Sequence, residues 1–364
     1  MVFGLFKRKN KEQSKDSRYL TLTVREVIDI AQDAVNLIFE KPEGHFEYQP
    51  GQFITLIMTI DGKKIRRAYS LCTTPFEDEF PGVTVKRVPD GAMSNYINDH
   101  VKAGDQIKVM EPMGMFTTQY NESNEREVIF FGGGSGITPL MSIARSMLIK
   151  EPGSKLLLAY GNRSKEYIAF YDKLNELTAH SNGRFKVVHM LEEDAEGIAD
   201  YTGRPTTEVI KDIVEKSTFE FPECYICGPQ PMMDIVEEGL LGAGIRKESI
   251  RMESFEAGKT APDTHKADDK GSVSASEVTI LMDGEEHVIS VPSDQSILDA
   301  GLDNDLDMPY SCQSGLCTAC RGKCLEGEIS IEDAEGLSQE EIDEGYRLLC
   351  IGKPQSDKIK VEIG

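Results

Sequence analysis

The first third of the chain alternates short apolar runs with polar and glycine-rich breaks. Residues 19–24, YLTLTV, read as a strand, and further strand-like runs continue to about residue 118 without helical spacing between them. Many short strands without intervening helices are typical of all-β folds. We therefore predict an antiparallel β-barrel over residues 18–124.

The pattern changes near residue 127, where apolar runs alternate with stretches of helical spacing. The predicted strands are 128–131, 156–160, 185–190 and 224–227, and the predicted helices are 139–150, about 167–178 and 232–240. Alternation of strand and helix indicates a parallel sheet covered by helices. We therefore predict an α/β nucleotide-binding domain over residues 125–256.

Two segments have almost nothing to bury. Residues 1–17 join a short apolar start to basic residues, and residues 257–276 are mostly Gly, Ala, Ser, Thr, Asp and Lys. We expect the first to be a flexible tail, with a weak membrane-surface contact as the alternative, and the second to be a linker. The remaining residues, 277–364, then form a third domain.

Charge and composition limit the classes of function. The net charge of −22 argues against a nucleic-acid partner. Twenty acidic and six basic residues follow residue 273. This excess of negative charge can steer the domain toward a basic docking patch on a protein acceptor, or it can serve only solubility. No apolar run approaches the ~18 residues that span a bilayer. Eight cysteines without an export signal indicate the cytoplasm and metal or redox use.

Four cysteines of the last domain have the spacing of a plant-type 2Fe-2S site. Cys312, Cys317 and Cys320 form C-x4-C-x2-C, and Cys350 follows after a long gap. Zinc sites usually combine two matching close pairs, so this spacing disfavours zinc. Cys324 does not complete a four-iron run, which needs a first gap of two residues and a final proline. We expect it to be a spare thiol on the strand that leaves the loop.

A second cysteine pair, Cys224 and Cys227, forms C-x2-C on a predicted buried strand. Residues three apart on a strand point to opposite faces, so one ion cannot easily bind both. We therefore do not assign this pair to a metal.

Three upstream motifs are suited to binding nucleotide cofactors. In R-x-Y-S at 67–70, the arginine can neutralise a diphosphate, the tyrosine can pack on a flat ring and the serine can bind its redox edge. The loop GGGSGITP at 132–139 follows a strand and opens a helix, where backbone N–H groups attract a pyrophosphate. CGP at 227–229 ends the last predicted strand, at the ligand-binding edge of such sheets. Alone, each glycine motif also fits a tight turn.

In this order, the motifs resemble the ferredoxin–NADP reductase superfamily, in its members with a C-terminal plant-type ferredoxin domain. YGNRS at 160–164 and MESF at 252–255 make the chain most similar to reductase components of phenylacetyl-CoA oxygenases and to hybrid-cluster protein reductases. The resemblance implies that the barrel binds FAD, that the α/β domain binds NADPH or NADH, and that the last domain is an α+β, β-grasp ferredoxin. Residues 86–94 favour FAD over FMN.

The resemblance also implies roles for individual residues. Ser70, Cys227 and Glu253 are the expected catalytic residues beside the reacting rings. The expected flavin-binding residues are Arg67, Ala68, Tyr69, Ser70, Val85, Lys86, Val88, Gly91, Met93, Ser94 and Phe255. The expected dinucleotide-binding residues are Gly132, Gly133, Gly134, Ser135, Gly136, Thr138, Pro139, Arg163, Ser164, Cys227, Gly228 and Pro229.

The end of the second α/β strand bears on the choice of nucleotide. NAD-specific sites usually place an acid there, whereas Arg163 and Ser164 stand here and no acid follows before Glu166. We therefore expect NADPH to be preferred over NADH. The expected function is an NAD(P)H-dependent reductase that passes electrons through FAD and a 2Fe-2S cluster to a protein acceptor such as an oxygenase or hydroxylase. The alternatives are reduction of a desaturase or hybrid-cluster protein, and redox sensing with little turnover.

Overall fold

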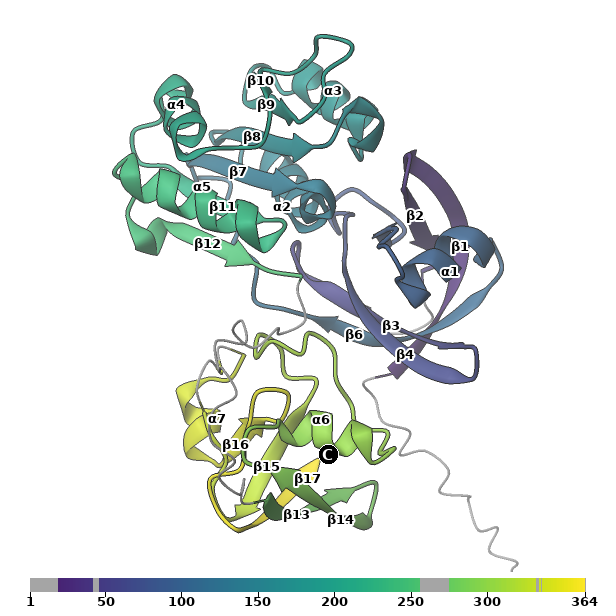
Figure 1. The fold of residues 1–364 in the computed structure, drawn as a ribbon. Coiled ribbons are helices and arrows are strands. Elements are labelled where there is room, and N and C mark those ends of the chain that lie inside the picture. Colours follow the sequence, from purple (N-terminus) through teal and green to yellow (C-terminus); the bar gives the residue numbers. More distant parts are fainter. Residues whose placement is uncertain (1–18, 42–45, 256–274, 332–333, 335, 364) are drawn as a thin grey trace, which may run out of the picture.

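The computed structural model describes most of the chain in three successive units (Figure 1). The residues described are 19–41, 46–255, 275–331, 334 and 336–363. The predicted tail lies outside them, as does the predicted linker except for its last two residues. Those two, Ala275 and Ser276, already pair with Pro292 and Val291 and so begin a strand.

The first unit is a six-stranded antiparallel sheet that curls on itself. Its strands are β1 (Tyr19–Ala31), β2 (Ala34–Phe39), β3 (Phe53–Ile60), β4 (Lys63–Ser70), β5 (Gly82–Lys86) and β6 (Gln106–Met113), in the order β4-β3-β6-β1-β2-β5. A bridge between Leu71, just after β4, and Val83 in β5 joins the two edges. Leu22, Leu37 and Leu56 are among the residues that fill the interior. The predicted β-barrel is confirmed.

One helix of this unit does not follow from the apolar pattern. Helix α1 (Ala92–His100) crosses between β5 and β6, and only Met93, Ser94 and Ile97 of it are buried. Two apolar core contacts in nine residues are too few to mark a helical period.

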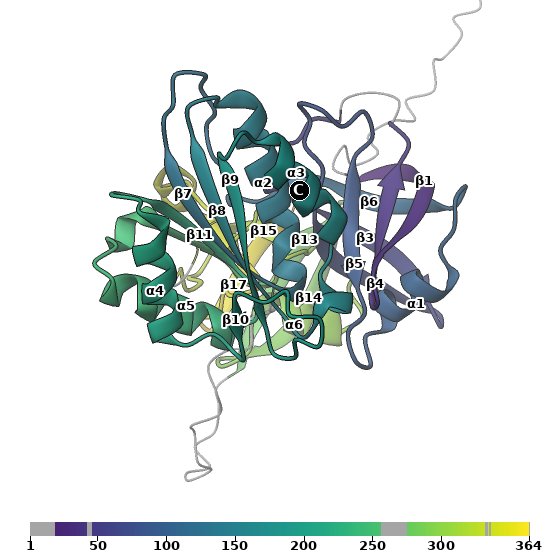
Figure 2. The same cartoon turned by 90° about the horizontal axis from the view of Figure 1, so that it is seen from above.

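The second unit is a parallel sheet with helices on both faces (Figure 2). Its strands are β7 (Glu127–Gly133), β8 (Lys155–Asn162), β9 (Phe185–Leu191), β10 (Tyr201–Thr202), β11 (Glu223–Cys227) and β12 (Ile250–Glu253), in the order β10-β9-β8-β7-β11-β12. Its helices are α2 (Ile137–Lys150), α3 (Tyr171–His180), α4 (Thr207–Ser217) and α5 (Gln230–Gly242), with short 3-10 turns at Gly134–Gly136, Lys165–Tyr167 and Lys247–Ser249. The predicted α/β architecture is confirmed.

The sheet separates two apolar cores. Phe130 and Cys227 lie in the core under α2 and α3, whereas Phe131 and Cys224 lie in the core under α4 and α5. Both cysteines are fully buried. They therefore point to opposite faces, as strand geometry predicts, and do not form a common ligand pair.

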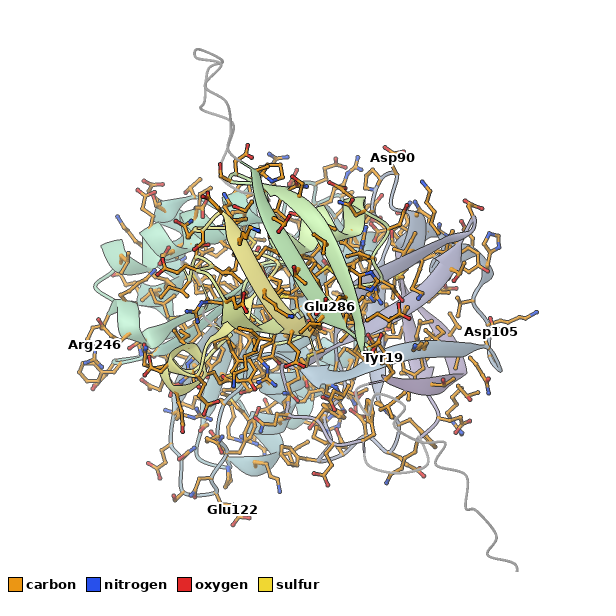
Figure 3. All side chains as sticks on the ribbon, turned by 90° about the horizontal axis from the view of Figure 1, so that it is seen from below. Tyr19, Asp90, Asp105, Glu122, Arg246 and Glu286 are labelled. Carbon is orange, nitrogen blue, oxygen red and sulfur yellow. The ribbon has the colours of Figure 1, made fainter. Side chains whose placement is uncertain are left out.

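The third unit is a five-stranded mixed sheet with a helix packed on it. Its elements are β13 (Ala275–Met282), β14 (Glu285–Pro292), α6 (Ile297–Asp303), β15 (Arg321–Glu326), α7 (Gln339–Asp343), β16 (Tyr346–Leu348) and β17 (Lys358–Ile363), with the strand order β14-β13-β17-β15-β16. Seen from below, β13, β14 and β17 lie in front of the other two units (Figure 3). None of the helices within the described ranges has the length and apolar content needed to cross a membrane.

Candidate active site

The carboxyl ends of the parallel strands bring the nucleotide motifs together. Gly132 in β7 lies beside Cys227 in β11, and Cys227 lies beside Glu253 in β12. On its other side, Gly132 lies beside Tyr160 in β8. Segments far apart in the sequence therefore meet at the edge where parallel sheets bind ligands.

The glycine loop after β7 packs too closely on its neighbours for side chains. A Cβ atom on Gly136 would overlap the Cys227 carbonyl oxygen, and one on Gly133 would overlap the Met232 sulfur. Gly134 has a φ of +52°, a left-handed conformation that glycine adopts readily. The Tyr160 hydroxyl donates a hydrogen bond of 2.9 Å to the Gly134 carbonyl. The loop is thus held by Tyr160, which the motifs alone do not single out as a loop contact.

Helix α2 opens directly from this loop without a side-chain cap. Its N-cap is Gly136, and no side chain accepts from its first N–H groups, whereas the Thr206 hydroxyl caps α4. Thr138 donates its hydroxyl to the Ser135 carbonyl at 3.0 Å and so stabilises the loop itself. The N-terminus of a helix suits a pyrophosphate, so this loop fits the dinucleotide that the motif predicts.

A cation from the barrel reaches the same loop. Lys86, at the end of β5, has its Nζ 3.3 Å from the position that a Cβ atom of Gly134 would occupy. It also forms an ion pair of 3.6 Å with Asp33. Lys86 therefore lies between the predicted flavin and dinucleotide sites.

The turn between β5 and α1 carries the other predicted flavin contacts. The Ser94 hydroxyl accepts a hydrogen bond from the Val88 N–H at 3.1 Å and donates one to the Gly91 carbonyl at 3.3 Å. Val85 and Met93 are buried in the barrel core, so only their backbone is available to a cofactor. Val88 is exposed.

A cavity of about 420 Å³ joins the barrel, β12 and the third unit. Among its lining residues are Arg67, Ala68, Ser70, Glu253, Phe255 and Cys312. Phe53, Phe116 and Leu316 supply apolar walls, so aromatic and guanidinium groups surround a space suited to a flat, anionic cofactor. Tyr69 is not part of the lining, and burial raises its pKa to about 12.

Glu253 supplies the carboxyl group among the lining residues of this cavity. It is buried, and its Oε2 has no hydrogen-bond partner among the described residues. Burial, with a smaller contribution from the charge of Cys312, raises the pKa of Glu253 to about 8. Its carboxyl is therefore neutral at pH 7 and available as a hydrogen-bond donor.

Cys227, its neighbour on β11, is fully buried. Burial, and secondly the nearby Glu253 carboxylate, raises the pKa of the Cys227 thiol well above its usual range. A neutral buried thiol is a poor nucleophile, so Cys227 contributes shape and packing.

The four predicted cluster ligands converge at one end of the third unit. Hydrogen bonds with Cys317 and Cys350 lower the pKa of Cys312, and their own pKa values are raised in return. The Leu349 N–H donates to the Cys320 carbonyl at 3.2 Å and so ties the distant Cys350 segment to the loop.

The four thiolates of this donor set are suited to a two-iron cluster. In the part of the chain that the structure describes, no three His, Cys, Asp or Glu side chains are grouped to hold one metal ion. A 2Fe-2S cluster does not need such a group, because each iron takes only two of the four protein thiolates. Cys324 donates its thiol to the carbonyls of Glu326, at the end of β15, and of Gly327, which follows it.

The predicted nucleotide-specificity residues lie at the end of β8. Arg163 is exposed and forms an ion pair of 3.6 Å with Glu193, from the segment after β9. Its guanidinium also lies over the Tyr167 ring, 5.7 Å from the centroid. Ser164 donates to the Glu166 carboxylate at 2.6 Å. The fold therefore places Glu193, an acid distant in sequence, beside Arg163.

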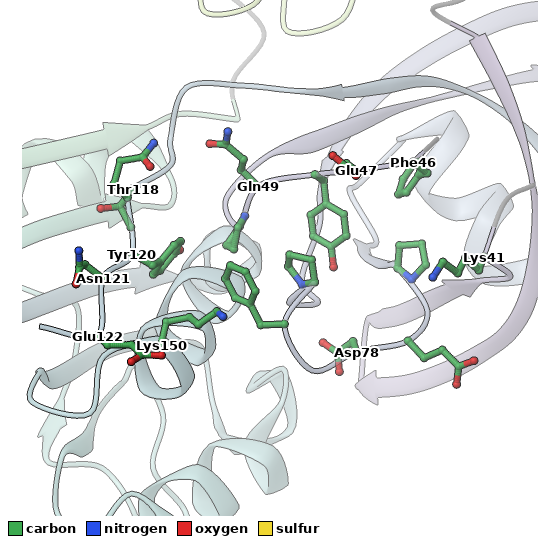
Figure 4. A pocket seen from close by; sticks show the side chains of 17 residues that line it. Lys41, Phe46, Glu47, Gln49, Asp78, Thr118, Tyr120, Asn121, Glu122 and Lys150 are labelled. Atoms are coloured by element: carbon green, nitrogen blue, oxygen red, sulfur yellow. The ribbon is translucent and has the colours of Figure 1, made fainter. Parts of the chain in front are cut away.

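A larger cavity, of about 750 Å³, lies away from these groups (Figure 4). Tyr120, Glu122 and Lys150 are among the residues along it. It contains none of the predicted site residues, so we do not assign it to the electron path.

Three family models match the chain in succession. They are an oxidoreductase FAD-binding domain over residues 20–118, an oxidoreductase NAD-binding domain over 130–238 and a 2Fe-2S iron–sulfur cluster binding domain over 280–355. The predicted cofactor classes are thereby confirmed, with NADPH and NADH not distinguished.

Relatives of similar length match this chain over nearly its whole length. The ferredoxin reductase component of 3-ketosteroid-9-alpha-monooxygenase from Rhodococcus rhodochrous is 35% identical, over 95% of this chain and 97% of the relative. A component of the 1,2-phenylacetyl-CoA epoxidase from Escherichia coli K12 is 31% identical, over 94% and 97%. The solved structure of phthalate dioxygenase reductase matches with a TM-score of 0.58 and 25% identity, over 95% of this chain and 98% of that one. This chain belongs to the family of FAD-, NAD- and 2Fe-2S-binding ferredoxin reductase components of oxygenases.

Proposed function

We propose that this chain oxidises NADPH in preference to NADH and delivers the electrons to an oxygenase or hydroxylase through FAD and its 2Fe-2S cluster. The observation that carries the proposal is the shared cavity, in which Cys312 lies with Arg67, Ser70 and Glu253. When bound, FAD supplies the conversion from a two-electron donor to a one-electron carrier. The predicted flavin-binding residues and the first predicted cluster cysteine therefore lie on the same cavity.

The protein groups have separate roles in this proposal. Arg67 neutralises the flavin phosphates, and Ser70 donates a hydrogen bond to the redox edge of the ring. Glu253 donates from its neutral carboxyl, and Phe255 covers the ring. Cys227, packed under the glycine loop, sets the surface on which the nicotinamide lies. Little proton transfer is required of the protein, whose contribution is position and electrostatics.

The acceptor and the location are also proposals. The relatives from R. rhodochrous and E. coli are components of a monooxygenase and an epoxidase, which supports an oxygenase acceptor. The acidic last domain favours a basic docking face on that acceptor. None of the eight cysteines, all of which lie within the described residues, forms a disulfide, which supports a cytoplasmic location. We assign the barrel to residues 18–124, the nucleotide domain to 125–256 and the ferredoxin domain to 277–364.

The test is steady-state kinetics of the protein loaded with FAD and iron–sulfur cluster. With ferricyanide or cytochrome c as acceptor, we expect fast turnover and a kcat/KM for NADPH above that for NADH. Arg163→Ala should reduce kcat/KM for NADPH by about tenfold, the value of one charge-assisted contact, and change the NADH value little. Arg204→Ala, which removes an exposed arginine paired with Glu192, is the control.

Two outcomes would count against the proposal. A strong preference for NADH would contradict the nucleotide assignment. Slow turnover with both acceptors, in protein shown to hold both cofactors, would contradict the reductase assignment and favour a redox sensor.

A further inference from the structure

The segment just before the first cluster cysteine is held by the barrel. The Asp307 carboxylate accepts hydrogen bonds from Lys64 and, at 2.8 Å, from Arg66, two residues of β4. Four residues later, the Ser311 hydroxyl shares a hydrogen bond with the Thr55 hydroxyl of β3. The next residue along the chain is Cys312. The polar contacts therefore end beside the cluster.

Apolar contacts continue the same interface through the cysteine loop. Cys317 and Ala319 pack with Phe53, Ile57 and Met110 of the barrel in one buried cluster. One side of the cysteine loop is thus covered by the outer face of β3 and β6. Because Phe53 and Cys312 also line the flavin cavity, this docking fixes how the cluster ligands face that cavity.

Arg66 is the most buried charged group of the interface, with a side chain 5% exposed. Its guanidinium lies 5.2 Å from the centroid of the Tyr310 ring. The Asp307 side chain is 55% exposed, so this ion pair has a buried cation and a carboxylate in contact with water. Although burial alone would raise it, Lys64 and Arg66 lower the pKa of Asp307. The second pair of Asp307, with Lys64, has side chains 46% and 55% exposed and is therefore the one that salt screens more strongly.

Neither domain needs these polar contacts to complete its own apolar core. The barrel and the ferredoxin unit have separate apolar cores, and Lys64, Arg66, Asp307 and Ser311 belong to neither. An arginine taken out of water is costly unless it is paired, so an arrangement that buries Arg66 against one exposed carboxylate calls for a functional reason. Holding Cys312 at the cavity is such a reason.

We propose that Arg66 and Thr55 are positioning residues for electron transfer between flavin and cluster. Arg66 binds Asp307 and Thr55 binds Ser311, and these two contacts hold the cysteine loop at the flavin cavity. One electron leaves the reduced flavin and reduces one ferric iron of the cluster, and no bond forms or breaks at the interface. The inference deepens the proposed function and rests on it. It adds that the docked state depends on the two interdomain ion pairs that Asp307 forms with Lys64 and Arg66.

The test compares Asp307→Asn with Asp305→Asn. Both remove one negative charge from the same exposed loop, but the ion pairs with Lys64 and Arg66 belong to Asp307. The positive φ of 60° at Asp305 is one that asparagine tolerates. In stopped-flow absorbance, NADPH should reduce the flavin at the normal rate in both variants. Asp307→Asn should slow the following cluster reduction by about tenfold, the equivalent of one charge-assisted hydrogen bond. Asp305→Asn should match the wild type.

Three further measurements separate positioning from a general defect. Raising NaCl from about 0.05 to 0.5 M should slow cluster reduction in the wild type and have less effect on Asp307→Asn. Small-angle scattering of the oxidised protein, without NADPH, should show a larger radius of gyration for Asp307→Asn. Thr55→Val, which removes the hydroxyl and keeps the shape, should slow cluster reduction in the same way.

The outcomes are distinguishable. Cluster reduction at the wild-type rate in Asp307→Asn and Thr55→Val, with an unchanged radius of gyration, would overturn the positioning role and leave the proposed function intact. Failure of NADPH to reduce the flavin of the wild type would instead overturn the proposed function. Slow cluster reduction in Asp305→Asn as well would contradict the assignment to the Asp307 pair.

Discussion

Replacing Arg145 with methionine should loosen the contact between the flavin and nucleotide domains. Arg145 lies on α2 and donates to both carboxylate oxygens of Asp78, at 2.7 and 2.9 Å, and to Glu77 at 2.5 Å. Glu77 and Asp78 belong to the loop that follows β4, whereas α2 begins at the glycine loop. The ion pair therefore links the loop after β4, next to the predicted flavin site, to the helix that follows the predicted dinucleotide loop.

The magnitude follows from how much of this pair water can reach. Breaking a fully buried ion pair costs about 3–5 kcal/mol, because the remaining charge is left without a partner. Here the Asp78 side chain is 24% exposed and the Glu77 side chain 54%, so water compensates part of the loss. The bonds from Ser142 to the Thr73 carbonyl and between Thr74 and Ser146 remain. We expect a loss of about 2 kcal/mol.

Thermal unfolding of the loaded protein measures this loss. For a unit of this size, 1 kcal/mol shifts Tm by about 2–4 °C, so Arg145→Met should lower the Tm by about 4–8 °C at fixed cofactor concentration. Flavin fluorescence reports the release of the cofactor. Stopped-flow reduction by NADPH should also slow, because a small displacement between reacting groups has a large effect on rate. Lys173→Met, which removes a cation from an exposed pair on α3, is the control.

A double-mutant cycle then assigns the effect to the pair. Asp78→Asn should change little further in the Arg145→Met background, because the partner is already absent. A Tm shift below about 1 °C, or full additivity of the two substitutions, would refute the reasoning.

Two further predictions concern the ends of the electron path. Cys350→Ser should abolish the visible absorption and the iron content of the cluster, while NADPH still reduces the flavin. Cys324→Ser should keep the cluster absorption and the iron, because in the described structure this thiol bonds only to backbone carbonyls. Iron loss in Cys324→Ser would contradict the ligand assignment. Burial raises the pKa of Glu253 to about 8, so its carboxyl loses its proton, and with it the donated hydrogen bond, as the pH rises through 8. The rate of flavin reduction should therefore fall between about pH 7 and 9. Glu253→Gln stays neutral and should lack this step, so the same pH profile in both proteins would argue against a role for the carboxyl.

The sequence by itself determined the domain types and predicted the cluster ligands. Cys312, Cys317 and Cys320 lie close together because they share one loop, so their spacing reports their chemistry directly. Strand periodicity likewise separated Cys224 from Cys227, which the structure places in different cores. The proximity of the three loop cysteines and the separation of Cys224 from Cys227 both follow from local backbone geometry, which residues near in sequence determine. Helix α1 escaped detection because it has only Met93 and Ile97 as apolar core contacts.

Only the tertiary structure decided which distant groups meet. Glu193 lies beside Arg163 although 30 positions apart in the sequence, and Asp307 pairs with Arg66 across two domains. Glu253, Ser70 and Cys312 share one cavity although each belongs to a different domain. Spacing along the chain sets the face of a strand or the shape of a loop, but the packing of sheets and domains decides which faces come into contact.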